Sequence, residues 1–175
     1  MIVVAIVGIL SMLAAYGVRK YIANSKTAEA RNALGRMAGA CAIAYEHENM
    51  ASPVLAAGSS TGFTRTMCKG GSTSVPGSLS LVAGKKYQST INDWNVDSAG
   101  GSGFYCLHFT IDQPQYYMYS YATSGTVNPG DSFTATANGD LNGDGITSTF
   151  QLSGSITASY VLTVAPNFVE TSPDE

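Results

Sequence analysis

Residues 140–148, DLNGDGITS, form the stretch of the chain that is richest in candidate ligands for a metal ion. Hard cations such as Ca²⁺ need several oxygens that converge at about 2.4 Å. The pattern D-x-N-x-D-G supplies side-chain oxygens from alternate residues, with a glycine for the sharp turn. The sequence therefore predicts a calcium site in this loop. Its ligands would be the side chains of Asp140, Asn142, Asp144 and Ser148 and the backbone carbonyl of Ile146.

The same loop also has a metal-free interpretation. Its twelfth position is Gln151, where an EF-hand has a bidentate glutamate, and no helices are expected to flank it. Asp and Asn side chains also accept hydrogen bonds from nearby backbone N–H groups in hairpin turns that hold no ion. Both the calcium site and the metal-free turn stay open at this stage.

The residue types and motifs of this chain give little indication of an enzymatic function. The chain has two histidines, His47 beside Glu46 and Glu48 and His108 in a predicted strand. Each is expected to be a surface or packed residue. No H-E-x-x-H and no phosphate-binding glycine loop followed by lysine occurs. We therefore expect a protein that is not an enzyme and whose one candidate cofactor is calcium.

The composition indicates a β-rich, exported domain of 175 residues. Apolar residues make up 45% of the chain and charged residues 12%, against a usual charged share of about 25%. Residues 1–50 hold five Lys or Arg against three Glu, whereas the remainder holds four against nine Asp or Glu. Because this acidic body repels phosphate backbones, nucleic-acid binding is not expected.

Three cysteines, Cys41, Cys68 and Cys106, are a second candidate for chemistry. Export to an oxidising compartment favours a disulfide, and three cysteines allow three pairings. We expect Cys68 to pair with Cys106, because this bond would attach a loop region to the first clear strand and leave Cys41 as a small buried apolar residue. A pairing with Cys41, or none, stays open. No C-x-x-C occurs, which argues against zinc and thiol exchange.

The N-terminal run, residues 1–18, holds no charged residue and is followed by Arg19 and Lys20. A cleaved secretory signal has a basic region in front, a shorter apolar run and a small-residue cleavage site behind it, so this interpretation is disfavoured. At 1.5 Å per residue the run spans about 27 Å, close to the hydrocarbon thickness of a bilayer. We expect a membrane anchor that stays in the working protein.

One helix of about 50 residues is predicted, because no proline occurs before Pro53 and apolar residues recur mostly every three or four positions. The first third of this helix is apolar all round. Its hydrophobic half is residues 1–22, and residues 23–52 are amphipathic. One half therefore needs an apolar environment on every side, whereas the other needs a single packed partner. The alternative is an ordinary signal anchor that continues into a helical stalk.

The rest of the chain is predicted as loop followed by sheet. Residues 53–102 are rich in Gly and Ser and include Trp94, which is expected in the core or in a subunit contact. Residues 103–175 contain stretches rich in Tyr, Phe, Thr, Val and Ile that are typical of strands. The predicted strands are 104–111, 116–122, 132–137 and 155–164.

The predicted fold class is α+β, with the long N-terminal helix packed on a C-terminal antiparallel sheet of about four strands. In the first predicted strand, alternation would place Tyr105, Leu107 and Phe109 on one face. The sheet is expected to cover the apolar stripe of the helix. This stripe consists of Leu34, Met37, Cys41 and Tyr45.

Two stretches resemble the type IV pilin family. MIVVAIVGILSMLAAYGVRKYIANSKTAEARNAL resembles the N-terminal helix of type IV pilins. GFYCLHFTIDQPQYYMYSYATSG, followed by FTATANGDLNGDGITSTFQL, resembles the globular part of pilin-like proteins. Just upstream of M-I-V-V, family members carry a leader peptidase sequence ending in Gly, then a Phe and, a few residues on, a Glu that aids assembly. This chain begins inside that motif, at Met1.

The resemblance implies a subunit that is inserted in the inner membrane, then extracted and packed into a filament. Its partners would be copies of itself, an assembly platform and a cytoplasmic ATPase motor. Burying an Ile, Val or Leu side chain is worth about 1.5–3 kcal/mol where water is the alternative, but lipid removes that driving force. The polymerisation core would be Met1, Ile2, Val3, Val4, Ile6, Val7, Ile9, Leu10, Met12 and Leu13.

The expected function is therefore that of a structural subunit of a type IV pilus, an extracellular filament for motility or adhesion. The subunit would reside in the inner membrane before assembly and at the cell surface afterwards. Two alternatives stay open. One is a pseudopilin of a type II secretion system, which forms a short periplasmic rod, and the other is a membrane-anchored adhesin that does not polymerise.

Overall fold

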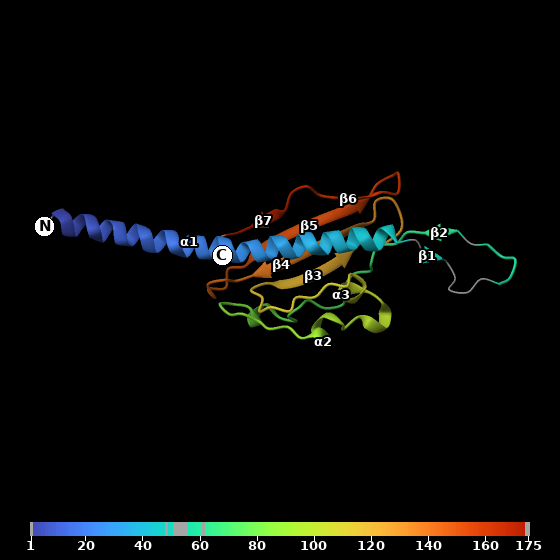
Figure 1. Ribbon diagram of the computed structural model, residues 1–175, viewed down its shortest axis with the longest axis horizontal. Helices are drawn as coiled ribbons and strands as arrows, with labels where there is room; N and C mark the ends of the chain where they lie inside the picture. Colours follow the sequence, from blue (N-terminus) through green and yellow to red (C-terminus); the bar gives the residue numbers. More distant parts are fainter. Residues whose placement is uncertain (1, 48, 51–55, 61, 174–175) are drawn as a thin grey trace.

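The computed structural model of the chain describes residues 2–47, 49–50, 56–60 and 62–173. A helix of 45 residues, α1 (Ile2–Glu46), precedes a five-stranded antiparallel sheet. The N-terminal half of α1 projects beyond the sheet, while its C-terminal half lies along it (Figure 1). The predicted α+β layout is thus confirmed.

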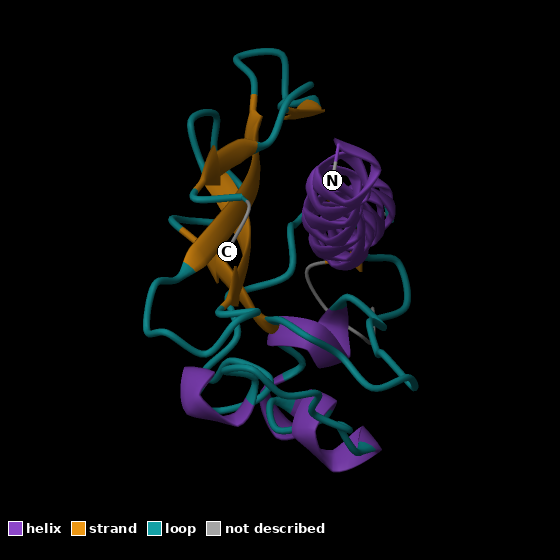
Figure 2. Ribbon diagram, turned by 90° about the vertical axis from the view of Figure 1, so that its left-hand side faces the viewer, coloured by secondary structure: helices purple, strands orange, loops and turns teal. Residues whose placement is uncertain are grey.

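Short elements separate the helix from the main sheet. They are β1 (Asn49–Met50), β2 (Phe63–Thr64), η1 (Leu79–Leu81), α2 (Ile91–Trp94), η2 (Ser98–Gly100) and α3 (Gly103–Cys106). β1 and β2 form a small antiparallel pair. Figure 2 shows α1 over one face of the main sheet and the short helices gathered beyond one of its edges. In Figure 1 the edge next to α2 and α3 is the β3 edge.

The main sheet has the order β3-β4-β5-β6, and β7 also pairs with β5. Its strands are β3 (Met118–Thr123), β4 (Ser132–Gly139), β5 (Ser148–Ile156), β6 (Leu162–Val164) and β7 (Val169–Thr171). β6 and β7 both pair with β5: Gly154 of β5 is opposite Val164 of β6, and Gln151 of β5 is opposite Val169 of β7. Together they form one edge of the sheet, alongside successive parts of β5. Residues 165–168 interrupt this edge and include Pro166, which has no N–H to donate to the ladder.

The core lies between the C-terminal half of α1 and the inner face of the sheet. The predicted stripe of Leu34, Met37, Cys41 and Tyr45 is almost fully buried, as expected. Alternate residues of β3, β4 and β5 face this stripe. They are Tyr119, Tyr121, Phe133, Ala135, Ala137, Phe150, Leu152 and Ile156.

Trp94 lies in the same core, which is one of the two locations predicted for it from the sequence. Its ring stands edge-on to Phe104 at 5.0 Å and to Phe109 at 5.4 Å between centroids. Its indole N–H donates to Ser89 Oγ at 3.0 Å, so the polar end of the buried side chain is satisfied.

The predicted strand 104–111 is wrong. This stretch forms α3 and a turn, and it begins at Gly103, whose φ of +57° suits glycine. Phe104 and Leu107, three residues apart, are both buried, as helical geometry requires, whereas Tyr105 is 41% exposed. Tyr105 therefore does not share a face with Leu107 and Phe109.

Three other predicted boundaries need correction. Residues 155–164 are two strands, because residues 157–161 turn back with Thr157 N–H donating to the Val161 carbonyl at 2.9 Å. β5 begins earlier than predicted, at Ser148. α1 ends at Glu46 and Asn49–Met50 form β1, so the helix does not reach residue 52; residues 48, 51 and 52 lie outside the described part. The strands predicted at 116–122 and 132–137 are confirmed as β3 and β4 with shifted ends.

Candidate functional site

The projecting half of α1 exposes apolar side chains on every side. All predicted polymerisation residues that the structure describes are between 51% and 77% exposed. These residues are Ile2, Val3, Val4, Ile6, Val7, Ile9, Leu10, Met12 and Leu13. Met1 lies outside the described residues. By length and composition α1 can cross a membrane, and the sheet covers none of its most apolar stretch.

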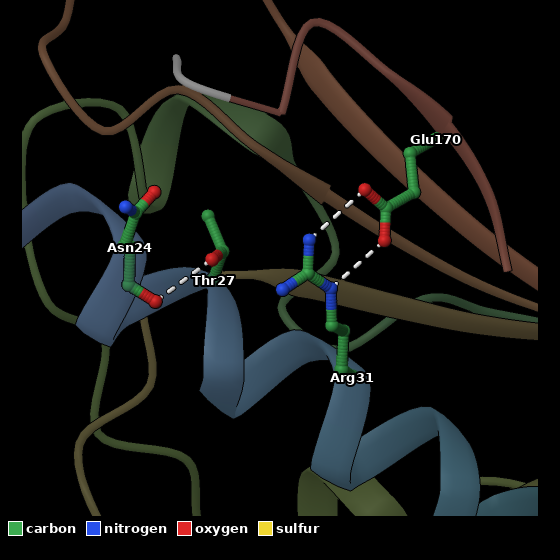
Figure 3. Close-up of polar contacts among 4 residues, drawn as sticks. All are labelled: Asn24, Thr27, Arg31 and Glu170. Atoms are coloured by element: carbon green, nitrogen blue, oxygen red, sulfur yellow. Dashed lines mark hydrogen bonds and ion pairs between the residues drawn. The ribbon is translucent and has the colours of Figure 1, made fainter.

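Cover from the domain begins at Thr27, the first buried residue of α1. Its hydroxyl donates to the Asn24 carbonyl at 2.8 Å and so stays satisfied inside the helix (Figure 3). Two positions further on, Glu29 Oε1 accepts the Tyr116 N–H and the Tyr119 hydroxyl, both at 3.0 Å. Burial raises the pKa of Glu29, while these hydrogen bonds and the charge of Lys86 act in the opposite direction.

Two arginines fasten α1 to the elements on its two sides. Arg31 donates from Nε and Nη2 to the two carboxylate oxygens of Glu170 on β7, at 2.8 and 2.9 Å (Figure 3). This hydrogen bonding lowers the pKa of Glu170. Arg36 donates to the Thr110 carbonyl at 3.2 Å, and its guanidinium lies 5.0 Å from the centre of the Phe109 ring. Both arginine side chains are therefore committed to contacts within the chain.

The predicted disulfide between Cys68 and Cys106 is present and closes a separation of 38 residues. It joins the loop after β2 to α3, so its second partner lies on a helix and not on the expected strand. Cys41 is a free, fully buried thiol, as predicted. It lies 3.2 Å from the Tyr121 hydroxyl, which itself donates to the Cys68 carbonyl at 3.2 Å. Burial raises the pKa of Cys41, which disfavours the reactive thiolate.

The acidic loop between β4 and β5 is held by hydrogen bonds from its own backbone. Asp140 is buried and accepts the Gly143 N–H at 2.6 Å on Oδ1 and the Gly145 N–H at 3.0 Å on Oδ2. Asn142 Oδ1 accepts the Asp144 N–H at 2.9 Å, and Asp144 Oδ1 accepts the Ile146 N–H at 2.8 Å. These are the contacts of successive Asx turns.

The candidate calcium ligands are only partly brought together. Asp140, Asn142 and Asp144 share the loop, whereas Ser148 is buried as the first residue of β5 and donates its hydroxyl to the Gly139 carbonyl at 3.0 Å. Within the described part of the chain, no group of three or more His, Cys, Asp or Glu is placed to hold a metal ion. Calcium binding at this loop stays a prediction.

Both histidines line one open cavity of about 630 Å³ beside the disulfide, although they are far apart in sequence. Its walls also include Ile43, Lys69 and Cys106. His47 and His108 are each exposed at the surface. No motif or spacing in the sequence links the end of α1 to the turn after α3, so the sequence carries no signal that the two histidines share a cavity.

No protein-family model matches this chain, and neither a curated protein nor a solved structure matches it.

Proposed function

We propose that this chain is the structural subunit of a filament of the type IV pilus kind and that it polymerises through α1. The observation that carries the proposal is the continuity of α1, whose exposed apolar half runs directly into the half that is buried against the sheet. A subunit built in this way holds an apolar rod at a fixed position relative to its own folded domain. The resemblance of the first 34 residues to pilin helices supports the same function.

The exposed half of α1 needs an apolar environment. About ten side chains, each worth about 1.5–3 kcal/mol on burial, would otherwise remain in water. A bilayer and a bundle of identical helices both remove them from water. The interior of a bilayer and the interior of a helix bundle are similarly apolar. Transfer of the helix from one to the other therefore has little hydrophobic driving force.

Extraction from the membrane therefore needs an external source of work. In this proposal the subunit first sits in the inner membrane, where an assembly platform and a cytoplasmic ATPase motor act on it. It then becomes part of a filament at the cell surface, where it serves motility or adhesion.

A membrane-anchored adhesin is a second candidate, favoured by the same helix, since α1 can span a bilayer on its own. A type II secretion pseudopilin would share the filament architecture but remain short and periplasmic. The three functions differ in where the chain is found and in its state of assembly.

The test is to delete the gene in the organism that produces this protein and to examine sheared surface material by electron microscopy. We expect surface filaments that contain this chain to disappear on deletion and to return on complementation with the wild-type gene. Loss of a secreted enzyme with surface filaments intact would favour the pseudopilin. If the chain always fractionates with membranes as single copies, the filament proposal is wrong.

A further inference from the structure

The end of the domain from which the apolar half of α1 projects is rich in lysine. Lys26 of α1 lies there, together with Lys85 and Lys86, which follow η1. In Figure 1 the loop between β4 and β5 and the segment around η1 both lie at this end, nearest the projecting half of the helix. We call this end the basal face and define it by Lys26, Leu81, Lys85, Lys86, Asp144 and Ile146.

Two loops of the basal face are joined to each other, and each exposes an apolar side chain. The Gly84 N–H donates to the Asp140 carbonyl at 2.8 Å, which holds the segment after η1 against the loop between β4 and β5. Leu81 is 45% exposed and Ile146 is 51% exposed. The basal face therefore combines apolar side chains with positive charge, and both features contribute to binding at anionic membrane surfaces.

One aromatic ring brings together two lysines that are distant in the sequence. Lys26 Nζ lies 4.7 Å and Lys86 Nζ lies 4.9 Å from the centre of the Tyr116 ring. The ring attracts each ammonium group, but the two positive charges repel each other. An anion beside both ammonium groups would offset this repulsion, so the arrangement favours an anionic partner.

Most carboxylates near the basal face are already engaged within the chain. Glu29 accepts two hydrogen bonds, Glu170 is paired with an arginine of α1, and Asp140 is buried and accepts two N–H groups. Asp144 is exposed and opposes the lysines. Residues 174–175 are acidic and lie outside the described residues. In the described part of the basal face, three lysines thus stand against one exposed carboxylate.

The residues of α1 that precede the basal face follow the order of the layers in a bilayer. Residues 2–18 carry no charge and extend about 26 Å, close to the hydrocarbon thickness of about 30 Å. Tyr16 and Tyr21 are 67% and 75% exposed, and tyrosine is enriched where hydrocarbon meets headgroups. Lys20 lies between them, and its long side chain reaches toward the headgroups. When α1 crosses a bilayer, headgroups therefore surround it from about residue 19 onwards.

The same measure places the basal face next to the headgroups. Lys26 follows residue 18 by about 12 Å along the helix axis. The headgroup layer takes about 5–8 Å of this distance. The remaining gap is shorter than the Debye length of about 8 Å at physiological salt, so the charges of the lysines act on the membrane surface. Because α1 runs into the domain without a break, a tilt of about 20° toward the sheet brings the basal face closer still.

We infer that the basal face binds the anionic phospholipid headgroups of the membrane that α1 crosses. The lysines attract the phosphate groups, and Leu81 and Ile146 add apolar contacts. This inference rests on the membrane stage of the proposed function and adds the face of the domain and the class of lipid. Release from an anionic surface is then part of the work that extraction of the subunit requires.

Photo-crosslinking of the full chain in lipid nanodiscs identifies what touches the basal face. The photoreactive residue p-benzoylphenylalanine replaces Ile146, and lipid adducts are identified by mass spectrometry after irradiation. We expect phospholipid adducts in discs with about 30% anionic POPG in POPC, and a yield lower by about threefold or more in pure POPC. The matched control is Val161, which is also 51% exposed but lies in the turn between β5 and β6, and it should give no adduct.

Charge variants test whether the lysines hold the basal face on the lipid. In Lys85→Gln/Lys86→Gln, and in about 0.5 M NaCl, the adducts at the Ile146 position in POPG discs should fall by about threefold or more. Arg65→Gln/Lys69→Gln removes the same charge from exposed positions outside the basal face and should leave the yield unchanged. An equal yield in pure POPC, or in Lys85→Gln/Lys86→Gln, would show that charge does not position the domain, and the inference would be wrong.

A probe at Leu10 separates this inference from the function on which it rests. The same photoreactive residue at Leu10 should give lipid adducts in both kinds of disc. If Leu10 links to lipid and the Ile146 position does not, the basal face stands clear of the membrane; the inference is wrong and the membrane stage survives. If Leu10 gives no lipid adduct, both fall together. Loss of the Ile146 adducts in millimolar inorganic phosphate would assign the lysines to a soluble anion and would also overturn the inference.

Discussion

Arg31 of α1 and Glu170 of β7 are joined by two hydrogen bonds of 2.8 and 2.9 Å across 139 positions of the sequence (Figure 3). The pair joins the last strand of the sheet to the helix, one turn after Thr27, the first residue of α1 that the domain buries. The two side chains are 43% and 26% exposed, so water screens the interaction. Its energetic contribution is therefore modest, although its geometry is specific.

Glu170→Gln should lower the free energy of unfolding by about 0.2–1 kcal/mol, the usual range for an exposed ion pair. Because Arg31 lowers the pKa of Glu170, the stabilisation is present above the ordinary glutamate pKa and is lost as the pH falls through the lowered value. Urea unfolding of the full chain in detergent, at neutral and acidic pH, measures both effects. An equal loss in about 1 M salt would contradict an electrostatic origin.

Glu29→Gln should stabilise the domain at neutral pH or leave it unchanged. Burial raises the pKa of Glu29, so the folded state holds its proton to a higher pH than the unfolded state does. The stability that this group contributes is full at acidic pH and falls as the pH rises through the raised pKa. Gln cannot ionise, and its amide oxygen can accept both the Tyr116 N–H and the Tyr119 hydroxyl. The difference in stability between variant and wild type should therefore grow as the pH rises from the ordinary glutamate pKa through the raised pKa of Glu29.

Glu29→Ala is the matched comparison, since it leaves both donors without their acceptor. It should cost about 1–3 kcal/mol at any pH. If the Gln variant loses as much as the Ala variant, the charge of Glu29 is needed and the assignment of a desolvation penalty is wrong.

The helix and its buried stripe could be predicted because both follow from the spacing of apolar residues along the chain. The disulfide could be predicted because only three cysteines can pair. Leu34, Met37, Cys41 and Tyr45 lie three or four residues apart, and this spacing decides the buried face wherever the partner lies. Residues 104–111 were mistaken for a strand because a short run of aromatic and apolar residues fits both periods. The helix forms because Gly103 adopts a φ of +57° at its start and because Phe104 and Leu107 are both buried by tertiary packing.

The contacts of the two arginines on α1 were not predictable from sequence. The partners of Arg31 and Arg36 are Glu170 and Thr110, which the topology brings beside the helix from distant parts of the chain. The turn at residues 157–161 contains neither Gly nor Pro, and its reversal uses Tyr160 at a φ of +58°. Sequence patterns carry no strong signal for such a residue.

Replacing both cysteines in Cys68→Ser/Cys106→Ser should destabilise the domain by about 3–4 kcal/mol, the value for a closed loop of this size. The segment of the chain that this disulfide closes, over a separation of 38 residues, includes α2, which contributes Trp94 to the core. Thermal unfolding of the full chain, with and without reductant, measures the effect. The double variant should be insensitive to reductant, and a loss below about 1 kcal/mol would show that the core alone holds this region.

Asp140→Ala should destabilise the loop between β4 and β5 without any metal present. The variant removes the acceptor of the Gly143 and Gly145 N–H groups. Because both glycines are exposed, water can take its place, and the cost is about 0.5–1.5 kcal/mol. Calcium then separates the two interpretations of the loop. A rise in the Tm of the wild type at millimolar calcium that Asp140→Ala lacks would establish an ion site. No rise, together with no heat in a calorimetric titration, would leave the metal-free turn.

Ile9→Arg should abolish assembly while leaving the folded domain intact. Ile9 is 62% exposed and lies in the half of α1 that the sheet does not cover, so the stability of the domain does not depend on it. An arginine at the centre of a membrane-spanning helix costs about 2.5–3.5 kcal/mol, and in a bundle of helices it would be an unpaired buried charge. We expect unchanged unfolding of the domain in detergent, together with loss of surface filaments by electron microscopy. Ile9→Leu, which keeps the apolar surface, is the control; if Ile9→Arg still builds filaments, the exposed half of α1 does not form their core.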